Sequence, residues 1–467
     1  MEIECLGAAQ TVTGSKHILR TQHATILLDC GLFQGRRRES IDLNHRLGVD
    51  PRELDAVILS HAHMDHSGAL PLLVKHGYEG PIYTTPATRD LCAAMLLDSA
   101  MIQEADARYI NKVIERDGAK MDPVVPLYTE NDAVQALGYF IGVPYHRRQR
   151  IAPGIDLEFF DAGHVLGSAL VVLDVDDDGT RKRFLFTGDL GRRHMPILRD
   201  PEIPMGASVL MMESTYGDRV HPPIEEMDDA LGTIIERTIA RRGKVVIPSF
   251  ALERAQELLF TMKRLRQKGR IARVPVYVDS PLTVKVTDVF KLHPECFDSE
   301  ALALIGGADS PFDFEGLRYV SDKEDSKALD ASSEPCVVIS ASGMCEGGRV
   351  LHHLKATVES ERNVIVIVGF QAQHTLGRRI VERRPRVRIF GVERDLRAEV
   401  AVLNGFSAHA DKRDLLGFAE SVRDRGSLGN VVLVHGEPVA QRALADALGR
   451  RGFSKVHIPA AGDRRTF

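Results

Sequence analysis

Residues 61–70 read HAHMDHSGAL and place three histidines and one aspartate within six positions, directly after the apolar run LDAVILS at residues 54–60. His61 and His63 lie two positions apart, so in an extended segment both rings point to the same side and can share one metal ion. Asp65 and His66 follow where the chain turns toward a helix, and they suit a second ion nearby. Imidazole and carboxylate ligands together fit zinc, with manganese or iron as competitors.

Further ligand-type residues stand at the ends of later apolar runs. His164 in DAGHVLGS lies among small residues that let the backbone approach closely. Asp189 in FTGDLG is flanked by glycines, and a carboxylate there can give one oxygen to each of two ions. For Asp161 and Asp29, near the same loops, we expect structural roles: a helix cap or turn for Asp161, and orientation of a ligating imidazole for Asp29.

The composition is that of an ordinary globular protein. The 467 residues are 44% hydrophobic and 27% charged, which suits two or three folded domains. The net charge of −5 gives no overall attraction to nucleic acid, so a polyanion must be bound locally. The six cysteines lack CxxC spacing, and the sequence shows neither a leader-like start nor an apolar run as long as a membrane span. We therefore predict reduced thiols and a cytoplasmic location, with no membrane association.

The pattern of apolar runs changes along the chain. Up to about residue 207, short runs lead into Gly-rich loops that carry the ligand-type residues, which is typical of a layered α/β fold. From residue 208 the runs become nearly continuous and alternate with helical segments, as expected of parallel strands covered on both faces. After residue 383 the chain again shows short apolar runs that lead into loops with ligand-type residues. We therefore predict one domain formed by residues 1–207 and 384–467, with residues 208–383 inserted as a separate α/β domain.

The motifs HAHMDHSG, DAGHVLGS and FTGDLG resemble the successive motifs of the metallo-β-lactamase superfamily. The resemblance covers residues 1 to about 207 and implies a four-layer αββα sandwich. Members of this superfamily act on very different substrates, so this fold alone leaves the substrate open.

Three later motifs narrow the choice. MMESTYGDR contains Glu213, NGFSAHADK contains His409 and VVLVHGE contains His435. They resemble motifs A, B and C of the β-CASP branch, metal-dependent nucleases that process RNA and, in some members, DNA. With VIPSFALERAQELL and ISASGMCEGGRVLHHL, the resemblance extends over nearly the whole chain. It is closest to bacterial and archaeal relatives of the cleavage and polyadenylation endonuclease, and it implies a β-CASP domain inserted in the αββα sandwich.

The resemblance implies a centre of two Zn²⁺ ions per chain, with Mn²⁺ or Fe²⁺ as alternatives. The expected ligands are His61, His63 and His164 for the first ion, Asp65, His66 and His435 for the second, and Asp189 between them. We assign Asp65, His409 and Glu213 to the catalytic set. His409 is either a general acid for the leaving oxygen or a hydrogen-bond donor to phosphate, and Glu213 orients His409 or a ligand.

The implied reaction is hydrolysis of phosphodiester bonds in single-stranded RNA by a water molecule that two metals activate. With no Trp and 6% aromatic residues, we expect contacts to the RNA backbone to dominate over base stacking. Arg219, Arg254, Arg349 and Arg378 are candidate basic contacts to the RNA. The alternative for each is an ordinary surface or helix-face role. The predicted substrate contacts are Ser340, Ser342, Gly343, Arg349, Ser407, Arg254 and Arg378.

Three questions stay open at the level of sequence. One alternative function is a small-molecule metallo-hydrolase of the same fold, of thioesterase or lactonase type, and another is a non-catalytic RNA-binding scaffold. We expect internal cleavage of RNA, because relatives that act as 5′ exonucleases usually carry a further C-terminal domain and only 32 residues follow His435. The sequence also leaves a homodimer open, with the C-terminal segment as a candidate contact.

Overall fold

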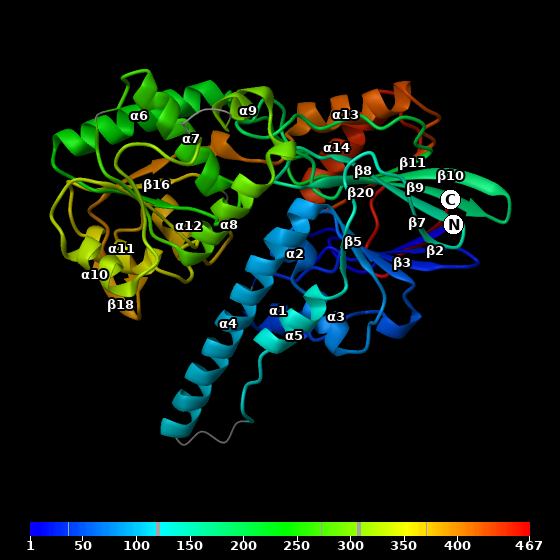
Figure 1. The fold of residues 1–467 in the computed structure, drawn as a ribbon, viewed down its shortest axis with the longest axis horizontal. Helices are drawn as coiled ribbons and strands as arrows, with labels where there is room; N and C mark the ends of the chain where they lie inside the picture. The colour runs from blue at the N-terminus through cyan, green and yellow to red at the C-terminus, as the bar shows by residue number, and fades with distance from the viewer. Residues whose placement is uncertain (36, 118–121, 272, 306–309, 370) are drawn as a thin grey trace. The chain divides into compact units, whose positions relative to one another are not determined.

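The computed structural model describes every residue except 36, 118–121, 272, 306–309 and 370 (Figure 1). The chain forms two compact units. Unit 1 contains residues 1–193, 200–220 and 409–467, and unit 2 contains residues 194–199 and 221–408. Among the helices of the described chain, none combines the length and the apolar character that crossing a membrane requires.

The first sheet of unit 1 has seven strands in the order β22-β1-β2-β3-β4-β5-β6. Neighbours from β3 to β6 are parallel, so the loops that follow these strands meet at one edge of the sheet. Its strands are β1 Glu2–Cys5, β2 His17–Arg20, β3 Thr25–Leu28, β4 Ala56–Ile58, β5 Ile82–Thr84, β6 Phe140–Gly142 and β22 Arg464–Thr466.

The second sheet of unit 1 also has seven strands, in the order β21-β20-β11-β10-β9-β8-β7. Strands β10, β11 and β20 are parallel to one another, and β8 runs in the same direction because it is antiparallel to β9, which is antiparallel to β10. The carboxyl ends of these four strands therefore share one edge. The strands are β7 Gln149–Ala152, β8 Ile155–Asp161, β9 Ala169–Asp177, β10 Thr180–Phe186, β11 Val209–Glu213, β20 Asn430–Val434 and β21 Val456–His457.

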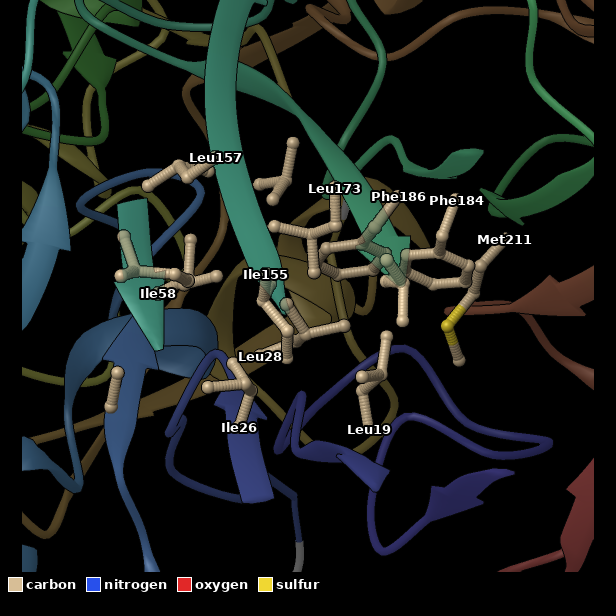
Figure 2. Close-up of a cluster of buried hydrophobic side chains, with 14 of the residues drawn as sticks. Leu19, Ile26, Leu28, Ile58, Ile155, Leu157, Leu173, Phe184, Phe186 and Met211 are labelled. Atoms are coloured by element: carbon tan, nitrogen blue, oxygen red, sulfur yellow. The ribbon is translucent and has the colours of Figure 1, made fainter. Parts of the chain in front are cut away.

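Apolar side chains from both sheets form the core between them (Figure 2). Ile26 and Leu28 on β3 alternate with outward residues, as the two-residue period of a strand requires. Phe184 and Phe186 on β10 follow the same alternation, and all four side chains are buried. Complete burial of such a side chain contributes about 1.5–3 kcal/mol, so this layer stabilises the stacking of the two sheets.

Helices cover the outer faces of the two sheets. Leu415 and Phe418 of α13 and Leu444 and Leu448 of α14 pack in one buried cluster with the outward residues of the second sheet. Helices α3, α4 and α5 lie on the outer side of the first sheet (Figure 1). The predicted four-layer αββα sandwich is confirmed. The helices of unit 1 are α1 Arg37–Asn44, α2 Met64–Ser67, α3 Leu70–Lys75, α4 Pro86–Arg116, α5 Glu130–Leu137, α13 Lys412–Asp424 and α14 Pro438–Arg450.

Unit 2 is built on a six-stranded sheet in which all neighbours are parallel, in the order β14-β13-β15-β12-β16-β19. Its central strands are buried along their whole length, which explains their nearly continuous apolar sequence. The strands are β12 Val245–Pro248, β13 Val276–Val278, β14 Leu317–Tyr319, β15 Val337–Ser340, β16 Val364–Ile367 and β19 Glu399–Val402, and a separate hairpin consists of β17 Arg386–Ile389 and β18 Val392–Asp395.

Helices pack on both faces of this sheet. The apolar side chains of α6 and α7 join one buried cluster with alternate strand residues, and those of α11 and α12 join a second cluster with the others. Unit 2 is therefore a doubly wound α/β domain, as the sequence predicts. Its helices are α6 Ile224–Ala240, α7 Arg254–Gln267, α8 Pro281–Leu292, α9 Ser299–Ile305, α10 Lys323–Ala331, α11 Val350–Thr357 and α12 Leu376–Val381.

The predicted boundaries after residues 207 and 383 differ from those of the two units. Strand β11, which the sequence pattern assigns to the inserted domain, pairs with β10 and β20 in the second sheet of unit 1. Strand β19, expected in the domain that follows, pairs with β16 at the edge of the sheet of unit 2. The insertion thus begins and ends later in the chain, at residues 221 and 408.

Candidate metal centre

The loops that carry the predicted ligands converge because the strands before them end at shared edges. His61 and His63 follow β4, and the short helix α2 continues directly with Asp65 and His66. Close backbone contact holds this loop: Leu32 N donates to Met64 O at 2.9 Å. A Cβ atom on Gly31 would stand 1.6 Å from the carbonyl oxygen of Asp65, so only glycine permits this approach.

The first cluster consists of four ligand-type side chains within 4.8 Å of one another: His61, His63, His164 and Asp189. Nδ1 of His63 lies 3.0 Å from Nε2 of His61 and 3.3 Å from Nε2 of His164. Oδ2 of Asp189 lies 3.5 Å from Nε2 of His61 and 3.4 Å from Nε2 of His164. Three ring nitrogens and one carboxylate oxygen therefore point at one place.

The second cluster consists of Asp65, His66 and His435. Nε2 of His435 lies 3.2 Å from Nε2 of His66 and 3.5 Å from Oδ2 of Asp65. Oδ1 of Asp189 lies 3.3 Å from Nε2 of His66 and 3.3 Å from Nδ1 of His435. The two oxygens of Asp189 thus face different clusters, which is the arrangement expected of a bridging carboxylate.

Hydrogen bonds on the far side of the rings fix which nitrogens carry protons. Ser60 Oγ donates its one proton to Asp29 Oδ2, so Nδ1 of His61 must donate to Ser60 Oγ at 3.0 Å. The carboxylate of Asp29 accepts from Nδ1 of His66 at 2.7 Å. Thr215 Oγ1 donates to the carbonyl oxygen of His435 and therefore accepts from Nδ1 of that ring at 3.2 Å. In all three rings Nδ1 is thus the donor on the far side, and Nε2 is the nitrogen that faces the clusters.

Whether the nitrogens that face the clusters fit a metal is tested by what lies opposite them. Nε2 of His66 and Nε2 of His435 lie 3.2 Å apart and both side chains are buried, so this pair needs either a proton or a cation between the two nitrogens. A cation between acceptor atoms removes their mutual repulsion, and orientation of ligating imidazoles by carboxylates or hydroxyls is typical of metal sites. The donor set of imidazole and carboxylate fits zinc and its competitors.

Burial also keeps two of the rings neutral. It lowers the pKa of His61 and of His164 well below the usual value, which leaves their lone pairs available to a metal. His66 differs: burial acts in the same direction, but the carboxylates of Asp189 and Asp29 outweigh it and raise the pKa of His66 well above the usual value.

Glu213 and His409 lie beside the first cluster. Oε1 of Glu213, which is fully buried, accepts from the backbone N–H of Leu190 at 2.8 Å and lies 3.1 Å from Nδ1 of His409. The same nitrogen lies 3.9 Å from Oδ2 of Asp189. Burial would lower the pKa of His409, but Glu213 and Asp189 outweigh it and raise that pKa to about 9. This contact lies where Glu213 can orient His409, and the catalytic role of both residues stays a prediction.

The two aspartates for which we expect structural roles lie where those roles require. Asp29 orients His66, as described above. Asp161 accepts from the backbone N–H of Gly163 at 2.9 Å through Oδ1, and so stabilises the turn before His164. Sequence reasoning missed Ser60 and Thr215. Their only signal is position, since Ser60 directly precedes His61 and Thr215 lies two residues after Glu213.

Several predicted substrate contacts in unit 2 are already engaged within that unit. Arg349 pairs with Oδ1 of Asp279 at 2.6 Å and donates to three backbone carbonyls of residues 320–322. Arg254 is buried and pairs with Glu257. Ser340 is buried and donates to the carbonyl oxygen of Asp279 at 2.7 Å. These contacts stabilise the fold of unit 2 and leave few hydrogen-bond donors of these three side chains for a phosphate group.

The remaining predicted contacts differ in accessibility. The side chain of Arg378 is 44% exposed and shares a surface ion pair with Glu382. Ser342 and Ser407 are half-buried, and Gly343 is buried against Phe250. Phosphate contact therefore stays a prediction, with Arg378, Ser342 and Ser407 as accessible candidates and Gly343 as a buried one.

Comparison with family models defines the class of protein. The model described as the metallo-beta-lactamase superfamily matches residues 17–226, and the Beta-Casp domain model matches residues 255–380. A third model, described as the Zn-dependent metallo-hydrolase RNA specificity domain, matches residues 393–459. The class is therefore a metallo-β-lactamase fold that carries a β-CASP domain.

Individual relatives agree with this class. The chain is 39% identical to ribonuclease TTHA0252 of Thermus thermophilus over 97% of both proteins. It is 33% identical to transcription termination factor FttA of Methanosarcina mazei over 97% of this chain and 69% of that protein. It is 32% identical to FttA of Pyrococcus abyssi, over 98% of this chain and 70% of that protein. The chain belongs to the β-CASP family of the metallo-β-lactamase superfamily.

A solved structure confirms the fold alone. The crystal structure of a protein of unknown function from Enterococcus faecalis V583 matches 100% of this chain and 99% of its own chain, with a TM-score of 0.55 and 14% sequence identity.

Proposed function

We propose that this chain is a metal-dependent ribonuclease that hydrolyses phosphodiester bonds inside single-stranded RNA. The observation that supports it most is the pair of clusters joined by Asp189, because hydrolysis of phosphate esters at two adjacent cations is a recurring use of such sites. The match to an RNA specificity domain and the relative named a ribonuclease support RNA as the substrate.

In this proposal the seven predicted ligands would hold two zinc ions, or manganese or iron in their place, and Asp189 would contribute one oxygen to each cluster. Such a pair of divalent cations supplies charge stabilisation at the phosphoryl oxygens and lowers the pKa of the attacking water.

Side chains of the chain itself orient His409 and the ligating rings, and one of them supplies a proton. Glu213 holds Nδ1 of His409, so that Nε2 is the atom free to reach a substrate oxygen. A protonated ring at that place donates to a phosphate oxygen or passes its proton to the leaving oxygen. Asp29, Ser60 and Thr215 keep the ligating rings in one orientation, which keeps the site ready before substrate arrives.

The test uses single-stranded RNA labelled at one end, incubated with the purified full chain and with Asp65→Ala. We expect a ladder of internal products from the wild type and none from the variant, because the second cluster loses its only carboxylate outside the bridge. His146→Ala is the matched control, since this ring is 53% exposed and lies in neither cluster.

Other outcomes would overturn the proposal. Equal cleavage by wild type and Asp65→Ala would assign the activity to a contaminant or to another site. Release of single nucleotides from one end would contradict internal cleavage. Metal-dependent turnover of a thioester or lactone without RNA cleavage would favour a small-molecule hydrolase, and RNA binding without any cleavage would favour a scaffold.

A further inference from the structure

Phe250 is exposed in a part of unit 2 that is otherwise closed to solvent. Every residue from 243 to 263 is buried apart from Phe250, which is 39% exposed. This segment runs from β12 into α7, so Phe250 lies two residues beyond the carboxyl end of a central strand. A single exposed apolar residue is ordinary on a protein surface, so its place in the sheet and its surroundings decide whether it has a function.

The place of Phe250 is the one where a doubly wound sheet binds its ligand. Helix α7, which follows β12, packs on one face of the sheet. Helices α11 and α12, which follow the neighbouring strands β15 and β16, pack on the other face. The loop after β12 therefore diverges from the loops on both sides of it. Ligands of open α/β sheets bind where such loops diverge, at the carboxyl ends of the strands.

The ring of Phe250 is held by the two neighbouring loops. A Cβ atom on Gly343, after β15, would stand 2.9 Å from Cδ2 of the ring, and one on Gly369, after β16, would stand 3.6 Å from Cε2. Both glycines therefore let backbone approach the same edge of the ring. Gln371 is buried and joins these two loops, because its Nε2 donates to the carbonyl oxygens of Gly343 at 2.9 Å and of Gly369 at 3.2 Å. The ring thus has a fixed support and still reaches solvent.

A flat apolar ring on a fixed support suits a flat ligand. Every nucleobase has a flat face, and stacking of bases on aromatic side chains is a common way to bind single-stranded nucleic acid. Single-stranded RNA offers such faces, whereas the bases of a duplex are already stacked on one another.

We propose that Phe250 is a platform on which one nucleobase of single-stranded RNA stacks, so that unit 2 contains a base-binding subsite of its own. This inference rests on the proposed ribonuclease function, and it adds a contact to a base to the backbone contacts that the composition favours. Stacking tolerates any base, so the subsite fixes the position of the strand and does not read its sequence.

The first experiment uses fluorescence. The chain contains no tryptophan, so Phe250→Trp introduces a single reporter. We measure it in the Asp65→Ala background, in which added single-stranded RNA stays intact. The emission should be quenched as RNA binds, because the indole stacks on a base. Phe390→Trp is the matched control: Phe390 is also an exposed phenylalanine of unit 2, but it lies between β17 and β18 against the ring of His352, so its emission should not change.

The second experiment removes the base instead of the ring. RNAs that lack the base at one position in turn are titrated in the same background by fluorescence anisotropy. With Phe250 present, loss of the base at one position should raise Kd roughly 5- to 100-fold. Phe250→Ala should raise Kd for intact RNA by the same factor and should no longer respond to loss of that base, and Phe250→Tyr should restore both properties. The dependence of Kd on salt should stay unchanged, because no phosphate contact is lost.

Three results would overturn the inference and leave the ribonuclease function standing. They are RNA binding without quenching of Phe250→Trp, equal quenching of Phe250→Trp and Phe390→Trp, and a Phe250→Ala variant that still responds to loss of every base as the parent does. The fluorescence experiment decides the matter even if Phe250→Ala does not fold. Failure of the proposed function looks different: the wild type would neither bind nor cleave RNA, and the inference that rests on that function would fail with it.

Discussion

The most informative perturbation of the metal centre is Asp29→Asn, which changes no ligand. Oδ2 of Asp29 accepts from Nδ1 of His66 at 2.7 Å and from the hydroxyls of Ser60 and Ser15, both at 3.1 Å. Oδ1 accepts from the backbone N–H of Ser60 at 2.8 Å. An asparagine has only one oxygen, so one of these two positions must become a donor that faces another donor.

Both placements of the new amide disturb the site. With its nitrogen toward His66, the ring must move its proton to Nε2, which is the atom that faces Asp189 and His435. With its nitrogen toward Ser60, the backbone N–H that precedes the first ligand loses its acceptor. The backbone itself is not strained further, because φ of Asp29 is 59° and asparagine tolerates that region.

We expect the affinity for the second metal to fall roughly 10- to 100-fold, which is about 1.4–2.8 kcal/mol. A competition titration with a chromophoric chelator measures that affinity, and elemental analysis gives the metal content after dialysis. Asp174→Asn is the control, because it makes the same chemical change at a carboxylate that pairs with Arg183 away from the clusters. Wild-type affinity in Asp29→Asn would refute the argument that this carboxylate fixes the proton of His66.

Three further predictions concern other parts of the molecule. His409→Asn should retain its metal content and slow cleavage by roughly 10²- to 10⁴-fold, and loss of metal would instead make His409 a ligand. Gly31→Ala should lose metal by elemental analysis, since its Cβ would stand 1.6 Å from a carbonyl oxygen of the α2 loop. Burial would lower the pKa of His353, but the carboxylates of Asp279 and Asp330 outweigh burial and raise that pKa. The protonated ring should therefore stabilise the fold fully below pH 6.5, and this stabilisation should decline as the pH rises through the raised pKa. Urea unfolding of the full chain at several pH values should show this decline in the wild type and not in His353→Gln, and identical pH profiles would contradict the assignment.

The predicted metal ligands come together in the structure because they occur in dense local motifs at strand ends. The spacing of His61, His63, Asp65 and His66 is itself informative, and a strand end is where a parallel sheet brings loops together. The structure adds what the motifs do not encode, namely how the two oxygens of Asp189 divide between the clusters.

Domain boundaries and long-range partners were harder to predict for a physical reason. The apolar run of β11 shows that this strand is buried, but not which of two sheets it joins. An arginine in a sequence likewise does not show its partner: Arg349 pairs with Asp279, 70 residues away in the chain. Ser60 and Thr215 were missed because a hydroxyl has no distinctive spacing.

The pairing of β11 with β20 has a consequence for synthesis of the protein. Residues 209–213 pair with residues 430–434, and His435 follows immediately, so unit 2 leaves the ribosome before the last member of the second cluster does. We expect ribosome-bound chains that end before residue 430 to lack that cluster and to be inert toward RNA. The second cluster is therefore complete only after residue 435 has been translated.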